Sequence, residues 1–180
     1  SKNKLNIQMV DLKSQYLKIK SQVDLAISEV INSTQFINGS HVKGFQTELA
    51  DYMGVKHVIT CGNGTDALQI AMMGLGLKPG DEVITPSFTY IATTEVIALL
   101  GLKPVFVDCD PKTFNISANE IEKAITNKTK AIVPVHLFGQ SCNMNAILDL
   151  AKKYKLYVIE DNAQAIGCDY YGFSENKKTG

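Results

Sequence analysis

Two adjacent carboxylates, Glu160 and Asp161, follow an apolar stretch in the segment VIEDNAQAIG, residues 158–167. A strand that ends here would place them at the carboxyl end of a sheet. Successive strand residues face opposite ways, so only one of the two carboxylates can face a ligand there. Gln164 lies three residues after Asp161 and could return to the same side on a turn. The pattern predicts a ligand-binding carboxylate and amide, with an ordinary capping role for Asp161 as the alternative.

The segment CGNGTDAL, residues 61–68, could bind an anion. Gly62 and Gly64 permit a tight backbone turn. Thr65 and Asp66 then open a predicted helix, whose first N–H groups have no partner inside the helix. The segment therefore predicts a phosphate cradle. The alternative is a plain strand-to-helix loop in which Thr65 is the N-cap.

The same segment also fits the dinucleotide fingerprint G-x-G-x-x-G/A, with Gly62, Gly64 and Ala67 at its fixed positions. That motif needs an acidic residue at the end of the next strand, where the acid holds a ribose. The nearby acids, Asp81 and Glu82, precede the predicted strand. The pattern therefore favours a phosphate cradle over a nicotinamide-binding oxidoreductase, which stays the weaker alternative.

Other strand ends also carry side chains that could meet a ligand. Phe88 and Tyr90 follow the predicted strand at 82–85, and an aromatic ring there could stack on a planar ligand or pack into the core. Asp108 and Asp110 could hold a metal, but this spacing before a proline is more typical of a turn, and we predict no metal site.

Apolar runs alternate with helical patterns along most of the chain. The predicted strands are 57–61, 82–85, 104–107, 131–136 and 156–159. Helices are predicted at 15–31, 42–52, 66–73, 89–100, 117–125 and 144–154. Continuous apolar strands that alternate with helices are typical of an α/β fold, a mostly parallel sheet flanked by helices on both faces. In such sheets the ligand crevice lies at the carboxyl ends of the strands, where His136 also ends one predicted strand.

The composition bounds the class of protein. The chain has 180 residues, 45% of them hydrophobic, and a formal net charge of +0. Balanced charge gives no electrostatic footprint for nucleic acid or an anionic membrane surface, so we expect neither as a partner. No apolar run is long enough for a signal peptide or a membrane-spanning helix. Four separated cysteines predict reduced thiols in a cytoplasmic protein, without disulfides or a zinc site: Cys61, Cys109, Cys142 and Cys168.

Taken together, these stretches resemble the N-terminal half of the pyridoxal-phosphate-dependent sugar aminotransferases, the DegT/DnrJ/EryC1/StrS family of fold type I. The resemblance covers nearly the whole chain. It is carried by GNGTDAL, GDEVITPSFTYIAT, KPVFVDCDP, TKAIVPVHLFGQ and VIEDNAQAIG. It implies an incomplete fold-type-I large domain at residues 55–180, which binds pyridoxal 5'-phosphate (PLP), after an N-terminal helical segment at residues 1–54.

The resemblance implies where the phosphate and one face of the cofactor ring would lie. Gly64, Thr65 and Asp66 would lie against the cofactor phosphate. Tyr90 would stack on the pyridine ring.

The resemblance also implies that Asp161 is catalytic and pairs with the ring nitrogen, while Gln164 reaches the ring hydroxyl. A carboxylate against that nitrogen keeps it protonated, and a cationic ring withdraws electrons from the substrate carbon. The family's Schiff-base lysine follows in a phrase SFxxxK, and this chain ends at Gly180 before such a phrase. We therefore expect that these 180 residues alone do not transfer an amino group.

The activity that the resemblance implies is transfer of an amino group, commonly from glutamate, to a nucleotide-linked keto sugar. It places the protein, as a homodimer, in amino-sugar or surface-polysaccharide biosynthesis. The wording of GNGTDALQI and PSFTYIAT favours a 3-keto sugar on UDP or dTDP over a 4-keto sugar. The alternative from another class is a non-catalytic homologue that acts as a binding or regulatory partner.

Overall fold

The computed structural model describes residues 9–172 and 177–178. The chain divides into two compact units, Ser1–Ile59 and Thr60–Gly180. The division at residue 54 into a helical segment and a cofactor-binding domain stays a prediction. None of the helices in the described residues is long and apolar enough to span a bilayer.

The first unit consists of two helices, α1 (Leu12–Ser33) and α2 (Ser40–Met53). Asp11 caps α1, because its side chain accepts a hydrogen bond from the Ser14 N–H at 3.0 Å. Gly54 ends α2 at φ 68°, a left-handed conformation that glycine adopts without steric cost. Both helices are predicted by their apolar spacing, and neither α1 nor α2 contains a buried residue.

The second unit contains a parallel sheet with strand order β2-β1-β3-β4. Its strands are β1 (Glu82–Pro86), β2 (Lys103–Val107), β3 (Thr129–Ile132) and β4 (Tyr157–Val158). Every pair of neighbours in this sheet is parallel. The prediction of a parallel sheet from continuous apolar runs is confirmed.

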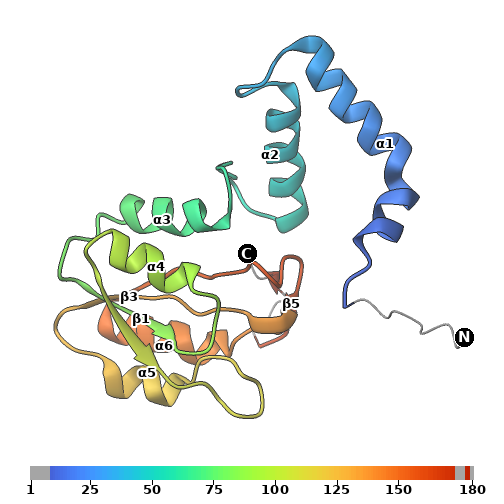
Figure 1. Ribbon diagram of the computed structural model, residues 1–180. Helices are drawn as coiled ribbons and strands as arrows, with labels where there is room; N and C mark the ends of the chain where they lie inside the picture. Colours follow the sequence, from blue (N-terminus) through green and yellow to red (C-terminus); the bar gives the residue numbers. More distant parts are fainter. Residues whose placement is uncertain (1–8, 173–176, 179–180) are drawn as a thin grey trace, which may run out of the picture. The chain divides into compact units, whose positions relative to one another are not determined.

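Helices cover both faces of this sheet, as predicted. They are α3 (Gly64–Gly74), α4 (Ala92–Leu99), α5 (Ala118–Ala124) and α6 (Met144–Tyr154). Figure 1 shows α3 and α4 on one side of the strands, with α5 and α6 on the other. A short 3-10 turn, η1 (Leu137–Gly139), follows the exit from β3.

The alternation of side chains along β1 explains the two layers of helices. Val83 and Ile84 are both fully buried, and successive strand residues face opposite sides. Val83 packs in one core cluster with Met72 of α3, whereas Ile84 packs in a separate cluster with Ile147 of α6. Each such side chain contributes roughly 1.5–3 kcal/mol when it is fully buried.

The prediction of a strand at residues 57–61 is wrong. These residues form no strand, and Ile59 is 78% exposed. A strand needs a neighbouring backbone to bond its N–H and C=O groups, and none of the described strands pairs with this segment. The antiparallel pair β5 (Asp169–Tyr170) and β6 (Lys177–Lys178) was not predicted, because two-residue strands carry no apolar period.

Candidate functional site

A cavity of about 430 Å³ lies where the carboxyl ends of the strands meet the start of α3 and the segment before α4. Its wall includes Gly64, Thr65, Tyr90, Asp161 and Gln164. These residues come from three separate stretches of the sequence, and the fold brings them together as the strand-end argument predicts. Asp66, the remaining predicted site residue, is not part of this wall.

The first turn of α3 forms the part of the wall that suits an anion. Asn63 is the N-cap: its Oδ1 accepts from the Asp66 N–H at 2.9 Å, and its Nδ2 donates to Asp66 Oδ2 at 3.0 Å. The alternative of Thr65 as N-cap is therefore wrong. The N–H groups of Gly64 and Thr65 have no acceptor inside the helix, as at any helix start. A Cβ on Gly64 would meet no atom within 4 Å, so open space lies beside these donors.

The backbone of Asp161 is fixed by the sheet although β4 has already ended. Its N–H donates to the Pro134 carbonyl at 2.9 Å, and its carbonyl accepts from the His136 N–H at 3.1 Å. Its carboxylate accepts from two neutral donors, the hydroxyl of buried Thr93 at 2.8 Å and the Ala163 N–H at 3.3 Å. Across the described ranges, no lysine or histidine forms an ion pair with Asp161.

Glu160 contributes to the same wall, and its carboxylate has a different partner from that of Asp161. It lies 2.9 Å from Nε2 of His136, which is fully buried. The Cys142 N–H donates to His136 Nδ1 at 3.1 Å, so Nε2 carries the proton and donates to Glu160. That only one of the two carboxylates faces a ligand stays a prediction, and His136 is a satisfied core histidine. Burial raises the pKa of the Cys142 thiol to about 12, so this thiol stays neutral.

The amide of Gln164 is held by a turn that the sequence analysis missed. Gln164 Oε1 accepts from the Phe138 N–H at 2.7 Å. Phe138 lies in η1 and has a left-handed backbone, with φ 57° and ψ 22°. The signal available in the sequence was Gly139, which follows directly and has φ 84°.

Two aromatic residues were candidates for the mouth of this cavity. Tyr90 is 75% exposed and lines the wall. Phe88 is not part of the wall, and its ring lies 5.9 Å from that of Phe114, centroid to centroid. The geometry therefore favours Tyr90 over Phe88 as a stacking surface.

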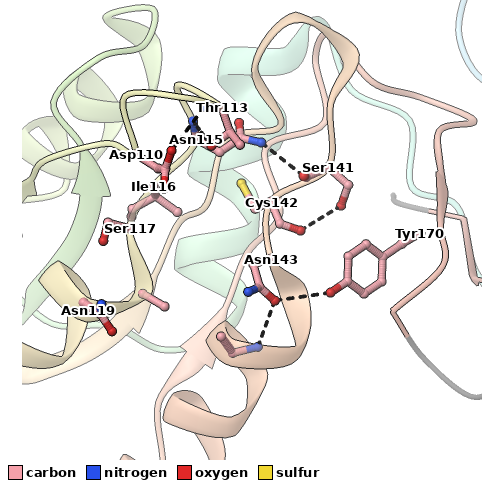
Figure 2. Close-up of a pocket in the computed structure, with 12 residues that line it drawn as sticks. Asp110, Thr113, Asn115, Ile116, Ser117, Asn119, Ser141, Cys142, Asn143 and Tyr170 are labelled. Carbon is pink, nitrogen blue, oxygen red and sulfur yellow. Dashed lines mark hydrogen bonds between the residues drawn. The ribbon is translucent and has the colours of Figure 1, made fainter.

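A second cavity of about 480 Å³ lies between the loop after β2 and the start of α6 (Figure 2). It contains none of the predicted site residues. Asp110, on its wall, accepts from the N–H groups of Lys112 and Thr113 at 2.7 and 3.2 Å, so this acid starts a turn as expected. In the part of the chain that the structure describes, no cluster of His, Cys, Asp and Glu side chains could hold a metal ion.

Comparison with known proteins establishes the family. The profile of the DegT/DnrJ/EryC1/StrS aminotransferase family matches residues 17–180. The chain belongs to this family. The resemblance seen in the sequence motifs is thereby confirmed, and with it the fold-type-I large domain.

Two curated relatives are about half identical to this chain. UDP-2-acetamido-2-deoxy-3-oxo-D-glucuronate aminotransferase of Pseudomonas aeruginosa is 52% identical over 166 residues, 92% of this chain and 46% of that protein. A pleiotropic regulatory protein of Geobacillus stearothermophilus is 51% identical over 168 residues, 93% of this chain and 45% of that protein. The chain thus spans about half the length of the curated relatives it matches.

A solved structure shows the same fold. NtdA from Bacillus subtilis, crystallised with bound cofactor PMP, matches with a TM-score of 0.84 and 38% sequence identity. The match covers 93% of this chain and 39% of NtdA.

Proposed function

We propose that this chain is the cofactor-binding part of a PLP-dependent aminotransferase that acts on a nucleotide-linked keto sugar. The observation that carries the proposal is Asp161, a partly buried carboxylate in the cavity wall. Neutral donors fix its orientation, and within the described residues no cation balances its charge. A protonated ring nitrogen would supply the missing positive charge.

The rest of the wall fits the same cofactor. The N–H groups of Gly64 and Thr65, with open space beside Gly64, suit the phosphate. The proposal assigns Asp66 an indirect part there, since its side chain bonds Asn63 at the helix start. The family contains proteins crystallised with PMP, as NtdA was.

In this proposal a few residues in and beside the cavity wall have defined parts in the chemistry. PLP, when bound, supplies an electron sink for the substrate carbon. Asp161 would hold a proton at the ring nitrogen, and the hydroxyl of Thr93 fixes the orientation of this carboxylate. Tyr90 would cover one face of the ring. Gln164 donates from Nε2, because its Oε1 already accepts from the Phe138 N–H.

None of the residues named in this proposal is the family's Schiff-base lysine. Among the described residues no lysine lines the cavity. That the 180 residues alone do not transfer an amino group stays a prediction.

The proposed substrate is a 3-keto sugar on UDP or dTDP, with glutamate as amino donor. The relative at 52% identity is named for a UDP-linked 3-oxo sugar acid. The proposal includes a role in amino-sugar or surface-polysaccharide biosynthesis in the cytoplasm, where thiols such as Cys61 and Cys142 stay reduced. It also includes a homodimer, which size-exclusion chromatography with light scattering would test.

The test is transfer of a labelled amino group by the intact protein. We would incubate it with PLP, glutamate labelled with ¹⁵N at the α-amino group, and a UDP-linked 3-keto sugar. Mass spectrometry should find ¹⁵N in the sugar product, much less with Asp161→Asn, and an unchanged amount with Asp149→Asn. Asp149 is a matched control because it is exposed on α6 and away from the cavity. A protein that neither binds PLP nor labels the sugar would contradict the proposal.

A regulatory role is the second candidate. The observation that favours it is the 51% identical relative, which is named a pleiotropic regulatory protein. The same assay separates the two functions: binding of PLP without labelling of either a 3-keto or a 4-keto sugar would favour regulation. The nicotinamide-binding alternative has no support in the fold, because Glu82 lies at the start of β1 and bonds Lys103 and Thr126 there.

A further inference from the structure

A buried asparagine outside the cavity holds the turn that contacts Gln164. Asn115 is 4% exposed and lies in the loop between β2 and α5. Its Nδ2 donates to the carbonyls of Gln140 at 3.0 Å and Ser141 at 3.1 Å, and its Oδ1 accepts from the Leu137 N–H at 3.2 Å. Figure 2 shows this amide bonded to Ser141, which also lines the second cavity. One side chain therefore bonds both ends of the segment 137–141.

The segment 137–141 is strained at its centre. Phe138 has φ 57° and Gly139 has φ 84°, so two consecutive residues adopt the left-handed region. A bulky residue rarely adopts this conformation, and it persists where the surroundings determine it. The Phe138 ring is 71% exposed, so packing of the ring does not account for the strain. The bonds from Asn115 hold the backbone on either side of Phe138, and the Gln140 N–H, which donates to the Leu137 carbonyl at 3.1 Å, closes the turn.

The strained backbone turns the Phe138 N–H toward Gln164. The bond to Gln164 Oε1 is 2.7 Å long. An amide whose oxygen already accepts this bond presents its NH₂ group elsewhere, and Gln164 lines the cavity. The turn also lies close to the Gln164 backbone, since a Cβ on Gly139 would be 3.3 Å from the Gln164 carbonyl oxygen.

We propose that Asn115 is a positioning residue for Gln164, acting through the turn 137–141 so that Gln164 Nε2 donates to an acceptor oxygen of the ligand in the cavity. The inference rests on the proposed function, in which that acceptor is the ring hydroxyl oxygen of PLP. Without the Asn115 donors, two carbonyls lose their partner and the turn relaxes from its left-handed conformation. The Gln164 amide is then free to rotate, and its donor is no longer fixed.

The test is a double-mutant cycle on PLP affinity, measured by absorbance titration of the intact protein. Asn115→Asp keeps the shape and the acceptor for Leu137 but removes both donors. Gln164→Ala removes the amide at an exposed position. Each change should weaken PLP binding by roughly three- to tenfold, the range of one hydrogen bond. The double variant should bind no more weakly than Gln164→Ala alone, because both changes remove the same contact.

Asn143→Asp is the matched control. Asn143 lies on the wall of the same second cavity, where it caps α6 and its Oδ1 accepts from the Ala146 N–H and the Tyr170 hydroxyl. Its substitution should leave PLP affinity unchanged in either background. If Asn115→Asp does not fold, Gly139→Ala strains the turn at a half-buried position with φ 84° and should give the same loss and the same lack of additivity.

The inference would be overturned if the fold losses of PLP affinity in Asn115→Asp and Gln164→Ala multiply in the double variant. It would also be overturned if PLP affinity is unchanged in both Asn115→Asp and Gly139→Ala. A wild-type protein that does not bind PLP would instead contradict the proposed function. The positioning claim is then read from hydrogen exchange of the Phe138 N–H, which Asn115→Asp should accelerate at least tenfold and Asn143→Asp should not. Unchanged exchange in Asn115→Asp would overturn the claim without reference to PLP.

Discussion

Glu82 and Asp161 are carboxylates at opposite ends of the strands of one sheet, Glu82 at an amino end and Asp161 after a carboxyl end. Their hydrogen-bond and ion-pair partners differ. Glu82 begins β1 and is 4% exposed, with Lys103 Nζ at 2.9 Å and the Thr126 hydroxyl at 2.5 Å. Asp161 follows β4 and accepts from the Thr93 hydroxyl at 2.8 Å. One carboxylate has a cation from its own chain, whereas the other has only neutral donors in the residues that the structure describes.

This difference separates a structural acid from a ligand-binding acid. A buried charge without a counter-charge is unfavourable, so folds usually provide a partner as they do at Glu82. The Thr126 hydroxyl and Lys103 lower the pKa of Glu82, which keeps it ionised. Hydrogen bonds fix the orientation of the Asp161 carboxylate, but no cation in the described residues pairs with it. This arrangement is expected of a carboxylate that pairs with a positively charged group on a ligand. Substitutions at the two sites should therefore affect different properties.

The largest effect should come from Asp161→Asn. The amide keeps the shape and the acceptor for Thr93 but cannot hold a proton at the ring nitrogen. Turnover of the intact protein should fall on the order of a hundredfold or more, while PLP still binds through the other contacts. Steady-state amino transfer and a PLP titration measure the two quantities. Near-normal turnover would remove Asp161 from the chemistry.

Glu82→Gln should do the reverse. Hydrogen bonds to a charged group contribute about 1.5–3 kcal/mol, and the free energy of unfolding should fall by that amount. Turnover per folded molecule should not change, because Glu82 lies at the amino edge of the sheet. Urea unfolding and the amino-transfer assay on the same samples check both parts. A selective loss of turnover with normal stability would erase the distinction between the two acids.

The contribution of Glu82 should depend on pH with a definite sign. Its pKa in the folded protein lies below the ordinary value of 4.5, so the folded state binds the proton less tightly than the unfolded state. The stabilisation is complete above pH 4.5 and is lost as the pH falls through the folded pKa. The difference in unfolding free energy between wild type and Glu82→Gln should shrink over that range, measured by urea titrations at successive pH values. A difference that stays constant down to the lowest accessible pH would contradict the assignment.

The smallest expected effect is at Tyr90. A stacking surface needs the ring and not the hydroxyl, so Tyr90→Phe should be mild. Tyr90→Ala should weaken PLP binding by about tenfold, since an aromatic contact contributes roughly 0.5–1.5 kcal/mol beyond area burial. Phe88→Ala is the control, because Phe88 lies off the cavity wall. A larger loss for Phe88→Ala than for Tyr90→Ala would transfer the role to Phe88.

The sequence predicts the sheet because the burial of β1 on both faces leaves an unbroken apolar run, as at Val83 and Ile84. The same reasoning failed at residues 57–61, since an apolar pattern does not reveal whether a neighbouring strand exists. The residues of the candidate site that follow strands could be predicted from the sequence. Parallel strands end on the same side of a sheet, and Asp161 follows one of these strands.

The parts of the site that escaped prediction are contacts across long sequence separations. Thr93 and Asp161 are 68 residues apart, and Asn115 is 26 residues from Ser141. Such pairs leave no local pattern of spacing. The left-handed backbone of Phe138 also has no signal in the residue itself, because phenylalanine ordinarily avoids that region.

The most direct test of the account is the protonation of the cofactor at Asp161. PLP labelled with ¹⁵N in the pyridine ring would be bound to the intact protein and observed by NMR at mildly alkaline pH. The ring nitrogen should be protonated in the wild type and in Glu82→Gln, and unprotonated in Asp161→Asn. The same protonation state in wild type and Asp161→Asn would contradict the claim that Asp161 is a carboxylate held ready for a ligand cation.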